Sequence, residues 1–427
     1  MNGSGTGRDD VDPDDAEPDD ISAEDIERAR RAIAGIAART PVIASAALSD
    51  LTGRPIWLKA ENLQRTGSFK LRGALSKLDQ LGDAAANGVT AGSAGNHAQS
   101  LAFAAQTRGL ACEIFVPVGA PIAKVEAARH YGATVREVGE SLTEAVAAAK
   151  YRAAEGNLAF CHPYDDPAVV AGQATLGVEL TEDFGASLRH VIVPLGGGGL
   201  ASGVAIAVKR FDPTIRVTAV QAAACAPYVT GAVPDGAVVT LADGIAVKQP
   251  GVITRPLIER WIDEIVIVEE NAIADAMVLV MERAKLVVEG AGAVGVAALM
   301  SGRVTPAADG TTCVILSGGN LDLNVVSGLI RRNETQSGRR LILFARISDR
   351  PGGLARLLTI FADSGANLVE VEHVREGLSL HVRETGVQAV LEVRGPDHAK
   401  AVIANAEAAG YAITVRSFAP ADSRLFS

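Results

Sequence analysis

The stretch HVIVPLGGGGLASGVAIAVKR, residues 190–210, joins an apolar run, a row of glycines and an alanine- and valine-rich segment. The apolar run, 190–195, is typical of a strand buried on both faces of a parallel sheet. The segment 199–210 has the spacing of a buried helix. Similar runs and segments alternate along most of the chain, which predicts an α/β fold with parallel sheets covered by helices on both faces.

The same alternation predicts the individual elements of the first three quarters of the chain. Strands are expected at 55–61, 88–92, 112–118, 133–139, 190–195, 216–221 and 311–317. Helices are expected at 22–38, 70–82, 97–108, 121–130, 141–154, 168–184 and 199–210, with Ser22 as the cap of the first. Parallel sheets of this kind bind ligands beyond the carboxyl ends of their strands, where the site is therefore expected.

The pattern changes near residue 335. The polar segment NETQSGRR, 333–340, is typical of a linker. After it the order is strand, helix, two strands, helix and strand, which predicts a small α+β domain of the ferredoxin-like kind. We therefore expect one domain at 21–335 and a second domain at 338–420.

Composition excludes several classes of function. A chain of 427 residues exceeds one ordinary domain core, and a net charge of −10 argues against a nucleic-acid partner. Residues 1–20 hold eight acidic residues and almost no apolar ones, so we expect a disordered tail. Neither a secretory signal nor a membrane-spanning apolar run is recognisable, which predicts a cytoplasmic protein without membrane contact. Reduced, mostly buried thiols are expected for the scattered cysteines Cys112, Cys161, Cys225 and Cys313.

The row of glycines indicates an anion site. Gly196, Gly197, Gly198 and Gly199, followed by Leu200, allow the backbone to wrap an anion at a helix N-terminus, with phosphate the expected guest. The same residues fit a loose dinucleotide fingerprint, which requires an acidic residue about twenty positions later. Residues 218–221 are Thr, Ala, Val and Gln, so a phosphorylated cofactor without a ribose diol fits better.

The segment ENLQRTGSFKLRGA, 61–74, places Lys70 at a helix start between Phe69 and Leu71. A lysine near the positive end of a helix and beside apolar groups is expected to have a lowered pKa. Schiff-base chemistry requires such a neutral amine. Taken alone, an ordinary lysine that faces solvent is the simpler interpretation.

Three further segments are candidate site loops. GSAGNH, 92–97, can direct backbone N–H groups at a carboxylate, or it is an ordinary glycine-rich turn. LSGGN, 316–320, puts Ser317 at the carboxyl end of a strand, where it is a site residue or a turn serine. VVEGAGA, 287–293, contains Glu289, which is a site carboxylate or a helix-end acid.

These five segments, in the order in which they follow one another along the chain, resemble the pyridoxal-phosphate (PLP) dependent enzymes of fold type II, the tryptophan synthase β-like family, and among them the threonine dehydratases. The resemblance implies a two-lobed α/β catalytic domain whose small lobe, about 62–165, is inserted in the large lobe. It implies that Lys70 forms a Schiff base with PLP and is the base at the substrate Cα. Phe69 and Asn96 would contact the cofactor ring, with Asn96 near its 3′-oxygen, and residues 196–200 would hold the phosphate.

The resemblance also assigns the remaining site residues. Ser317 would face the pyridine nitrogen, with Glu289 near the cofactor, while Ser93, Asn96 and His97 would surround the substrate carboxylate. A serine hydroxyl leaves the ring nitrogen largely neutral, and the weaker electron sink favours β-elimination over transamination. The implied reaction removes water and ammonia from a hydroxy-amino acid.

Two departures from the family pattern narrow the expectation. The related serine racemases have a serine at the second position of the SxGNH loop as a proton donor, whereas this chain has Ala94, so racemisation should be minor. Many relatives bind a divalent cation through a glutamate after the strand that matches 216–221 and a nearby aspartate. Residues 221–229, QAAACAPYV, contain neither acid, so we expect no metal.

The C-terminal segment resembles an ACT domain, a regulatory module of amino-acid enzymes, through DRPGGL (349–354) and GANL (365–368). The resemblance implies an amino-acid effector near Gly352, Gly353 and Asn367, and pairing into a homodimer or homotetramer. The leading hypothesis is a feedback-regulated threonine dehydratase that also acts on L-serine and makes 2-oxobutanoate for isoleucine synthesis. A serine/threonine racemase or serine-preferring dehydratase, and a catalytically silent amino-acid sensor, are the alternatives.

Overall fold

The computed structural model describes residues 21–375 and 383–417. The chain divides between Asp322 and Leu323 into two compact units, which we call the N-terminal and C-terminal units. The acidic stretch 1–20, predicted to be a disordered tail, lies outside the described residues.

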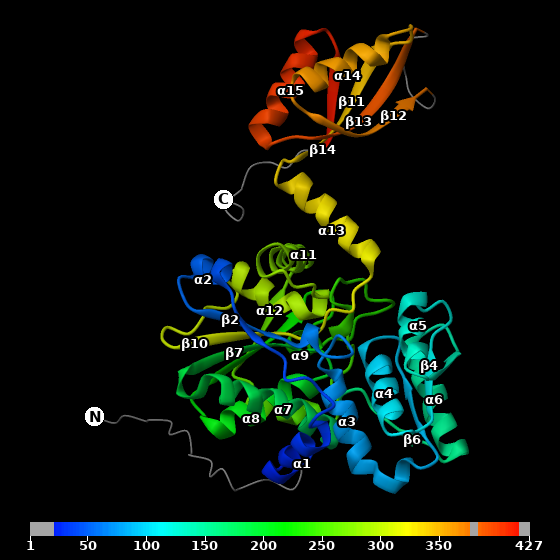
Figure 1. Ribbon diagram of the computed structural model, residues 1–427, viewed down its shortest axis with the longest axis vertical. Coiled ribbons are helices and arrows are strands. Elements are labelled where there is room, and N and C mark those ends of the chain that lie inside the picture. Colours follow the sequence, from blue (N-terminus) through cyan, green and yellow to red (C-terminus); the bar gives the residue numbers. More distant parts are fainter. Residues whose placement is uncertain (1–20, 376–382, 418–427) are drawn as a thin grey trace. The chain divides into compact units, whose positions relative to one another are not determined.

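A six-stranded sheet forms the large lobe of the N-terminal unit (Figure 1). Its strand order is β1 (Val42–Ala44), β2 (Ile56–Ala60), β10 (Thr311–Leu316), β7 (Leu188–Pro194), β8 (Arg216–Ala222) and β9 (Glu264–Val268). Only the β1–β2 pair is antiparallel among these neighbours. The helices of this lobe are α1 (Ala23–Ile33), α2 (Ala46–Thr52), α7 (Pro167–Phe184), α8 (Gly199–Phe211), α9 (Pro227–Thr230), α10 (Thr254–Trp261), α11 (Glu270–Leu279) and α12 (Gly290–Met300).

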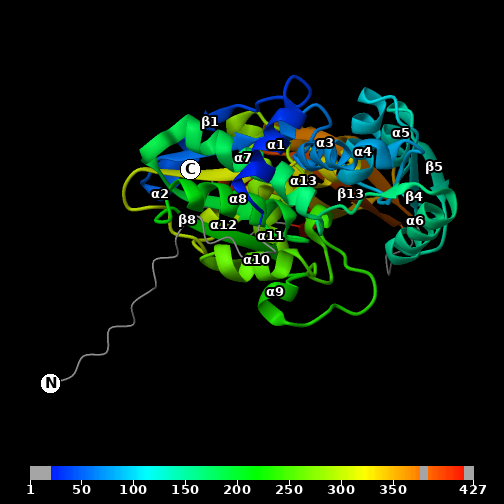
Figure 2. The same ribbon diagram turned by 90° about the horizontal axis from the view of Figure 1, so that it is seen from below.

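A second, parallel sheet lies between β2 and β7 in the chain, with the order β5 (Thr134–Glu137), β4 (Cys112–Val116), β3 (Val89–Gly92) and β6 (Ala159–Phe160). We call this sheet with α4 (Asn96–Thr107), α5 (Ile122–His130) and α6 (Leu142–Gly156) the small lobe. Figures 1 and 2 both show it to one side of the large lobe. The helix α3 (Lys70–Leu81) buries Leu71, Leu75 and Leu78 in the core of the small lobe.

The C-terminal unit begins with α13 (Leu323–Gln336) and continues as an antiparallel sheet with two helices. The sheet order is β12 (Asn367–Val374), β13 (Glu384–Glu392), β11 (Arg340–Ser348) and β14 (Ala412–Ser417). The helices α14 (Gly353–Asp363) and α15 (Pro396–Ala408) join these strands in the predicted βαββαβ order. Apolar side chains from the sheet and both helices form one core, which includes Leu343, Phe361 and Val402.

The structure confirms the predicted fold class, with two parallel sheets in the N-terminal unit and a ferredoxin-like α+β arrangement after them. The cap at Ser22 is confirmed, but α1 ends at Ile33 rather than 38 because Gly35 takes a left-handed conformation. The linker prediction for 333–340 is wrong. The helix α13 extends to Gln336 and buries Leu329 and Asn333, which lie one turn apart on the same face of the helix.

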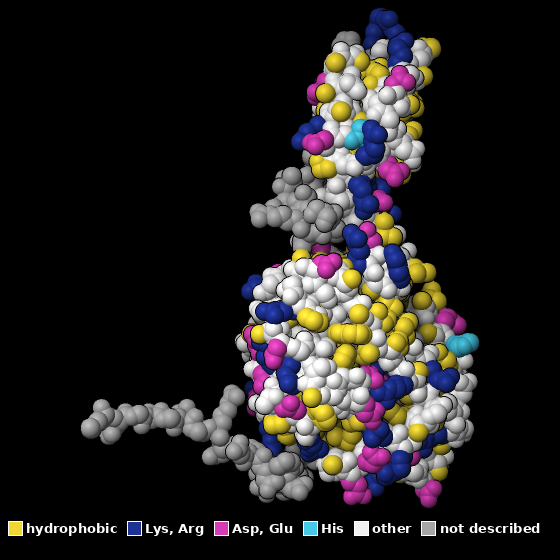
Figure 3. All heavy atoms as spheres, turned by 60° about the vertical axis from the view of Figure 1, so that its left-hand side comes forward, with side chains coloured by type: hydrophobic (Ala, Val, Ile, Leu, Met, Phe, Trp, Pro, Cys, Tyr) yellow, Lys and Arg dark blue, Asp and Glu magenta, His cyan; other side chains and the backbone are white. Residues whose placement is uncertain are grey.

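The described residues define the surface charges, the apolarity of the helices and the state of the cysteines. On the face of the N-terminal unit drawn in Figure 3, acidic and basic side chains are interspersed rather than separated by sign. No described helix combines the length and apolarity that a membrane span requires. All four cysteines are free and buried, as predicted.

Candidate active site

Lys70 is the first residue of α3, at the positive end of the helix. Its Nζ donates to the carbonyl oxygen of Pro163 at 2.8 Å and lies 5.2 Å from the centre of the Phe69 ring. Burial lowers the pKa of Lys70 to about 8, although the Glu289 carboxylate acts in the opposite direction. The shift has the direction that the sequence predicts, and burial is its main cause.

Backbone hydrogen bonds join the loop before Lys70 to the segment after β10. Phe69 N donates to Ser317 O at 3.1 Å, and Gly319 N donates to Gly67 O at 2.9 Å. The backbone N–H of Glu289 donates in turn to Gly318 O at 3.0 Å. These backbone hydrogen bonds hold the segments 61–74, 287–293 and 316–320 together. Ser317 is buried in this part of the structure.

Asn96 and Glu289 connect the two lobes. Asn96 begins α4 of the small lobe, and its Nδ2 donates to Glu289 Oε1 at 2.7 Å. Burial and the nearby Asp243 carboxylate raise the pKa of Glu289 to about 7. Glu289 is thus a buried carboxyl group poised to change protonation near neutral pH, which favours a site residue over an ordinary helix-end acid.

The glycine loop, Gly196–Gly199, is packed too tightly for side chains. A Cβ at Gly196 would lie 2.9 Å from Ile245 Cα, and one at Gly197 would overlap the Tyr164 ring. Gly198 has a φ of +97° and caps α8, which itself begins at Gly199. Within the described residues, the backbone N–H groups of this loop donate no hydrogen bond to another protein group. They remain free to bind an anion at the helix N-terminus.

Residues that the sequence did not reveal hold the glycine loop in place. Thr254 is fully buried, and its hydroxyl donates to Gly197 O at 2.6 Å. Asp165 accepts hydrogen bonds from the backbone N–H groups of Val252, Ile253 and Thr254 at 2.8–3.1 Å. The sequence feature that could have revealed Asp165 is the run HPYDDP, 162–167, in which this acid directly follows Pro163 and Tyr164.

The three residues expected to surround the substrate carboxylate lie together, with Asn96 and His97 in the first turn of α4 and Ser93 in the loop before it. Ser93 Oγ accepts a hydrogen bond from Gly95 N at 3.3 Å, which shapes the loop before α4. The imidazole of His97 is buried, and its Nε2 pairs with Cys161 O at 2.9 Å. Burial lowers the pKa of His97 to about 3, so the ring is neutral and part of the scaffold. What His97 offers to a ligand is its backbone N–H in the first turn of α4.

The region expected to lack a metal site contains no carboxylate ligands. Gln221 is buried at the end of β8, and its Oε1 accepts a hydrogen bond from Tyr228 N at 3.2 Å. Across residues 21–375 and 383–417, no group of three or more His, Cys, Asp or Glu side chains is placed to hold a metal ion.

A cavity of about 580 Å³ lies in the C-terminal unit where β11 ends and α14 begins. Charged and ionisable residues on its wall are Asp349, Arg350, His373 and Arg375, and its apolar residues include Ile347, Leu354 and Leu358. Arg375 donates to Asp349 at 2.8 Å.

The expected effector residues divide between this cavity and other places. Gly352 lines the cavity and caps α14 with a φ of +85°. A Cβ at Gly353 would overlap Ser348 O, so this position requires glycine. Asn367 is at the other end of β12 from His373 and donates to Glu392 at 3.2 Å, and its role at an effector site stays a prediction.

Comparison with known proteins places this geometry in a family. A family described as "Pyridoxal-phosphate dependent enzyme" matches residues 33–318. The L-threonine ammonia-lyase of Geobacter sulfurreducens is 45% identical over 384 residues, which cover 88% of this chain and 95% of that protein. The L-threonine ammonia-lyase of Thermotoga maritima is 40% identical over 397 residues, which cover 91% of this chain and 98% of that protein.

Solved structures agree with these matches. Maize serine racemase superimposes with a TM-score of 0.68 at 32% identity, covering 74% of this chain and 97% of its own. The T.th. threonine deaminase has a TM-score of 0.66 at 39% identity, covering 70% of this chain and 99% of its own. The matched range 33–318 contains Lys70, the glycine loop and Ser317, and the chain therefore belongs to the family of pyridoxal-phosphate-dependent enzymes.

Proposed function

We propose that this chain is an L-threonine ammonia-lyase, which converts L-threonine into 2-oxobutanoate and ammonia. The observation that carries the proposal is that the buried Lys70 lies close to the glycine loop, which can bind an anion. Lys70 contacts Pro163, and the next residue, Tyr164, packs on the glycine loop. Two relatives that match at least 88% of this chain are L-threonine ammonia-lyases, which supports the substrate.

The residues present fit PLP. The glycine loop is a cradle that any Cβ would fill, and its free N–H groups suit the phosphate. In the described part of the chain, the buried Ser68 Oγ, two residues before Lys70, has no hydrogen-bond partner. Lys70 would hold the cofactor covalently, with Phe69 and Asn96 at its ring, Ser317 at its nitrogen and Glu289 beside Asn96.

The chemistry divides between cofactor and protein. PLP supplies the electron sink that acidifies the substrate Cα–H when it is bound. Lys70 is the base at this proton, because burial brings the neutral amine into range near pH 8. Ser93 and the first-turn N–H groups of Asn96 and His97 bind the substrate carboxylate. In the net reaction, the Cα hydrogen and Cβ hydroxyl leave as water, and a water molecule then replaces the nitrogen, which leaves as ammonia.

A racemase is the alternative that shares this fold, as the likeness to maize serine racemase illustrates. Racemisation needs a proton donor on the face opposite Lys70. Ala94 occupies the loop position expected for that donor, and its methyl group packs against the core of the small lobe. An alkyl group cannot deliver a proton, so elimination is favoured.

The purified full chain, saturated with PLP, is expected to release one 2-oxobutanoate and one ammonia for each L-threonine consumed, and pyruvate from L-serine. Both products and the enantiomeric composition of the recovered substrate are measured together. Very little D-isomer is expected because of Ala94. Absence of oxo acid from both substrates rules out the lyase, whereas D-isomer formed as fast as oxo acid supports the racemase.

We also propose that the cavity of the C-terminal unit binds a small branched-chain amino acid that inhibits the lyase, as in the feedback control of isoleucine synthesis. Asp349 suits the ammonium group, and the arginines with the N-terminus of α14 suit the carboxylate. Leu354 and Leu358 offer an apolar wall for the side chain. The two ammonia-lyase matches support a shared regulatory unit, because 384 and 397 aligned residues exceed the 322 residues of the N-terminal unit.

L-isoleucine or L-valine is expected to lower the initial rate on L-threonine by at least about fivefold, the usual lower range of allosteric coupling. Asp349→Asn should raise the amino-acid concentration that gives half of this inhibition. Asp397→Asn is the matched control, because Asp397 is an exposed carboxylate on α15 of the same unit, outside the cavity. An unchanged rate with every branched-chain amino acid rejects the regulation while leaving the lyase intact.

A further inference from the structure

Asn320 connects the segments around the site through hydrogen bonds. Its Nδ2 donates to the backbone oxygen of Thr66 at 2.8 Å and to Asn96 Oδ1 at 2.8 Å. Asn96 in turn donates through Nδ2 to Glu289 Oε1 at 2.7 Å. We call this Thr66–Asn320–Asn96–Glu289 series the amide chain. It brings together residues from four sequence segments and both lobes.

The partners of the amide chain determine which way each amide points. A backbone carbonyl can only accept, so the Asn320 atom that faces Thr66 must be the nitrogen. The same nitrogen faces Asn96, so Asn96 must turn its oxygen toward Asn320 and its nitrogen the other way. Only one of the two hydrogens on Asn96 Nδ2 is used by Glu289. Among the residues that the structure describes, the other N–H of Asn96 has no acceptor, so it is available to a ligand.

The two ends of the amide chain differ in their dependence on pH. Burial raises the pKa of Glu289 to about 7, so this end changes protonation near neutral pH. The Thr66 carbonyl does not titrate. Asn320 is consequently the partner that keeps Asn96 in one orientation across the working pH range.

Close packing holds Asn320 at this place. Gly67 has a φ of +73°, and a Cβ there would overlap the Asn320 amide. The neighbouring Gly319 N–H bonds to Gly67 O at 2.9 Å, so backbone and side chain of this segment both contact the loop that leads to Lys70. The amide of Asn320 thus has little freedom to turn.

We propose that Asn320 is a positioning residue for the cofactor, which acts through Asn96 by keeping an N–H donor directed at the ring oxygen of PLP. The inference rests on the proposed cofactor role of Asn96. An N–H group stabilises an anionic ring oxygen, whereas the amide oxygen would repel it. Asn320 therefore sets both the affinity for PLP and the charge state of the bound ring.

Asn320→Asp tests this with almost no change in shape. The ionised side chain has no N–H donor, and it faces the carbonyl of Thr66 with an oxygen. Asn96 is then expected to turn its nitrogen toward position 320 and its oxygen toward the cofactor. We expect the Kd of the apoprotein for PLP to rise at least about tenfold, and the visible absorption band of the bound cofactor and its pH dependence to shift.

Asn62→Asp is the matched control. Asn62 belongs to the same neighbourhood, and its Nδ2 donates to the backbone oxygen of Val287 at 2.9 Å, without contact to Asn96. The same isosteric change removes the same kind of hydrogen bond and adds the same charge. The Kd for PLP and the absorption spectrum should both remain those of the wild type.

A double-mutant cycle distinguishes positioning from a general structural effect. If Asn320 acts through Asn96, Asn320→Asp should change the Kd for PLP little in an Asn96→Ala background. Equal effects in both backgrounds overturn the proposal, as does an unshifted spectrum in Asn320→Asp. Asn320→Ser, which also lacks the amide, replaces Asn320→Asp in the cycle if the charged variant does not fold. A wild type that binds no PLP overturns the proposed function as well, whereas normal binding without an effect at Asn320 overturns this inference alone.

Discussion

Lys70→Ala is expected to lower the rate of 2-oxobutanoate release from L-threonine by at least about a thousandfold. The substitution removes both the covalent link to PLP and the base at the substrate Cα. The remaining site would still bind the phosphate through the glycine loop, because none of its contacts depends on Lys70. The measurement combines the initial rate at saturating PLP with the visible absorption of the bound cofactor, whose imine band should disappear.

Lys77→Ala is the control for this experiment. Lys77 lies on the same helix, and its Nζ pairs at 2.6 Å with Asp166, the N-cap residue of α7. The control should keep the absorption band and most of the activity. Undiminished turnover in Lys70→Ala contradicts the proposed function and favours a silent sensor or a different catalytic base.

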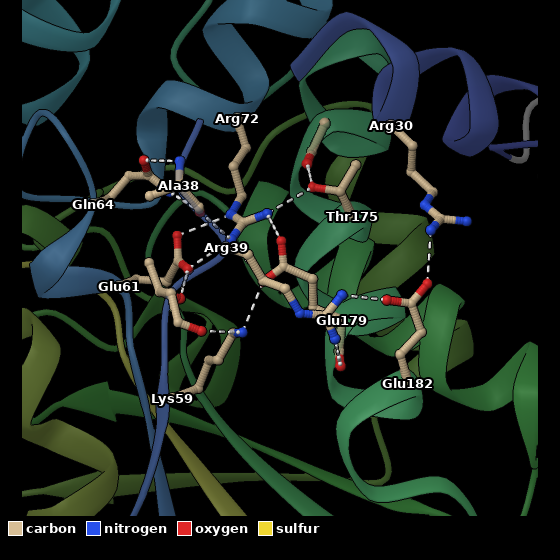
Figure 4. Close-up of polar contacts among 12 residues, drawn as sticks. Arg30, Ala38, Arg39, Lys59, Glu61, Gln64, Arg72, Thr175, Glu179 and Glu182 are labelled. Carbon is tan, nitrogen blue, oxygen red and sulfur yellow. Dashed lines mark hydrogen bonds and ion pairs between the residues drawn. The ribbon is translucent and has the colours of Figure 1, made fainter. Parts of the chain in front are cut away.

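Arg72→Met is expected to destabilise the N-terminal unit by about 3–5 kcal/mol. Figure 4 shows the Arg72 guanidinium between the carboxylates of Glu61 and Glu179. Arg72 and Glu61 are completely buried, with a closest contact of 2.8 Å. Burial alone would raise the pKa of Glu61, but Arg72 holds it below the usual value. Without Arg72, Glu61 loses the cation that contacts it directly. The nearby buried Lys59, whose charge also lowers the pKa of Glu61, is already paired with Glu179 at 2.7 Å.

Denaturant unfolding followed by tryptophan fluorescence measures this loss. Both tryptophans, Trp57 and Trp261, belong to the N-terminal unit, so the signal reports on that unit alone. Arg30→Ala breaks a largely exposed pair with Glu182 and should cost at most about 1 kcal/mol. The double variant Arg72→Met with Glu61→Gln should recover part of the lost stability, because the Glu61 carboxylate is then no longer a buried charge without its partner. Equal costs for Arg72→Met and Arg30→Ala contradict the prediction.

Local sequence patterns were sufficient to predict the fold class and the positions of the motifs along the chain. The strand β7, Leu188–Pro194, carries the apolar run 191–195 directly before the glycines, and such a run is typical of a strand in a parallel sheet. The strands β1 and β6 were not predicted because they have only three and two residues, too few to show a pattern. The strand β9 was also missed, although its sequence EIVIV is rich in the β-branched residues that favour strands. The helix α13 was missed because it buries only two residues, Leu329 and Asn333, and one of them is polar.

The candidate site was only partly predictable for a related reason. Lys70 and the glycine loop are recognisable because their neighbours in sequence create their chemistry. Asn320 and Arg72 depend on partners that are 224 and 107 residues away, and an asparagine or arginine gives no local sign of such a partner. His97 differs from Asn320 and Arg72. It lies in a candidate site loop of the sequence, but its ring is buried and pairs with the carbonyl oxygen of Cys161. The oligomeric state stays a prediction.

The tight packing of the glycine loop has a consequence for how this enzyme can change during evolution. Tyr164 blocks both Gly197 and Gly199, Ile245 blocks Gly196, and Thr254 blocks Gly198, so a side chain at any of the four glycines would require a simultaneous change at one of these neighbours. Single substitutions therefore cannot adjust the phosphate end of the site. New substrate preferences have to arise at the opposite end, around residues 93–97, where Ser93 and Ala94 carry side chains that can be exchanged one at a time.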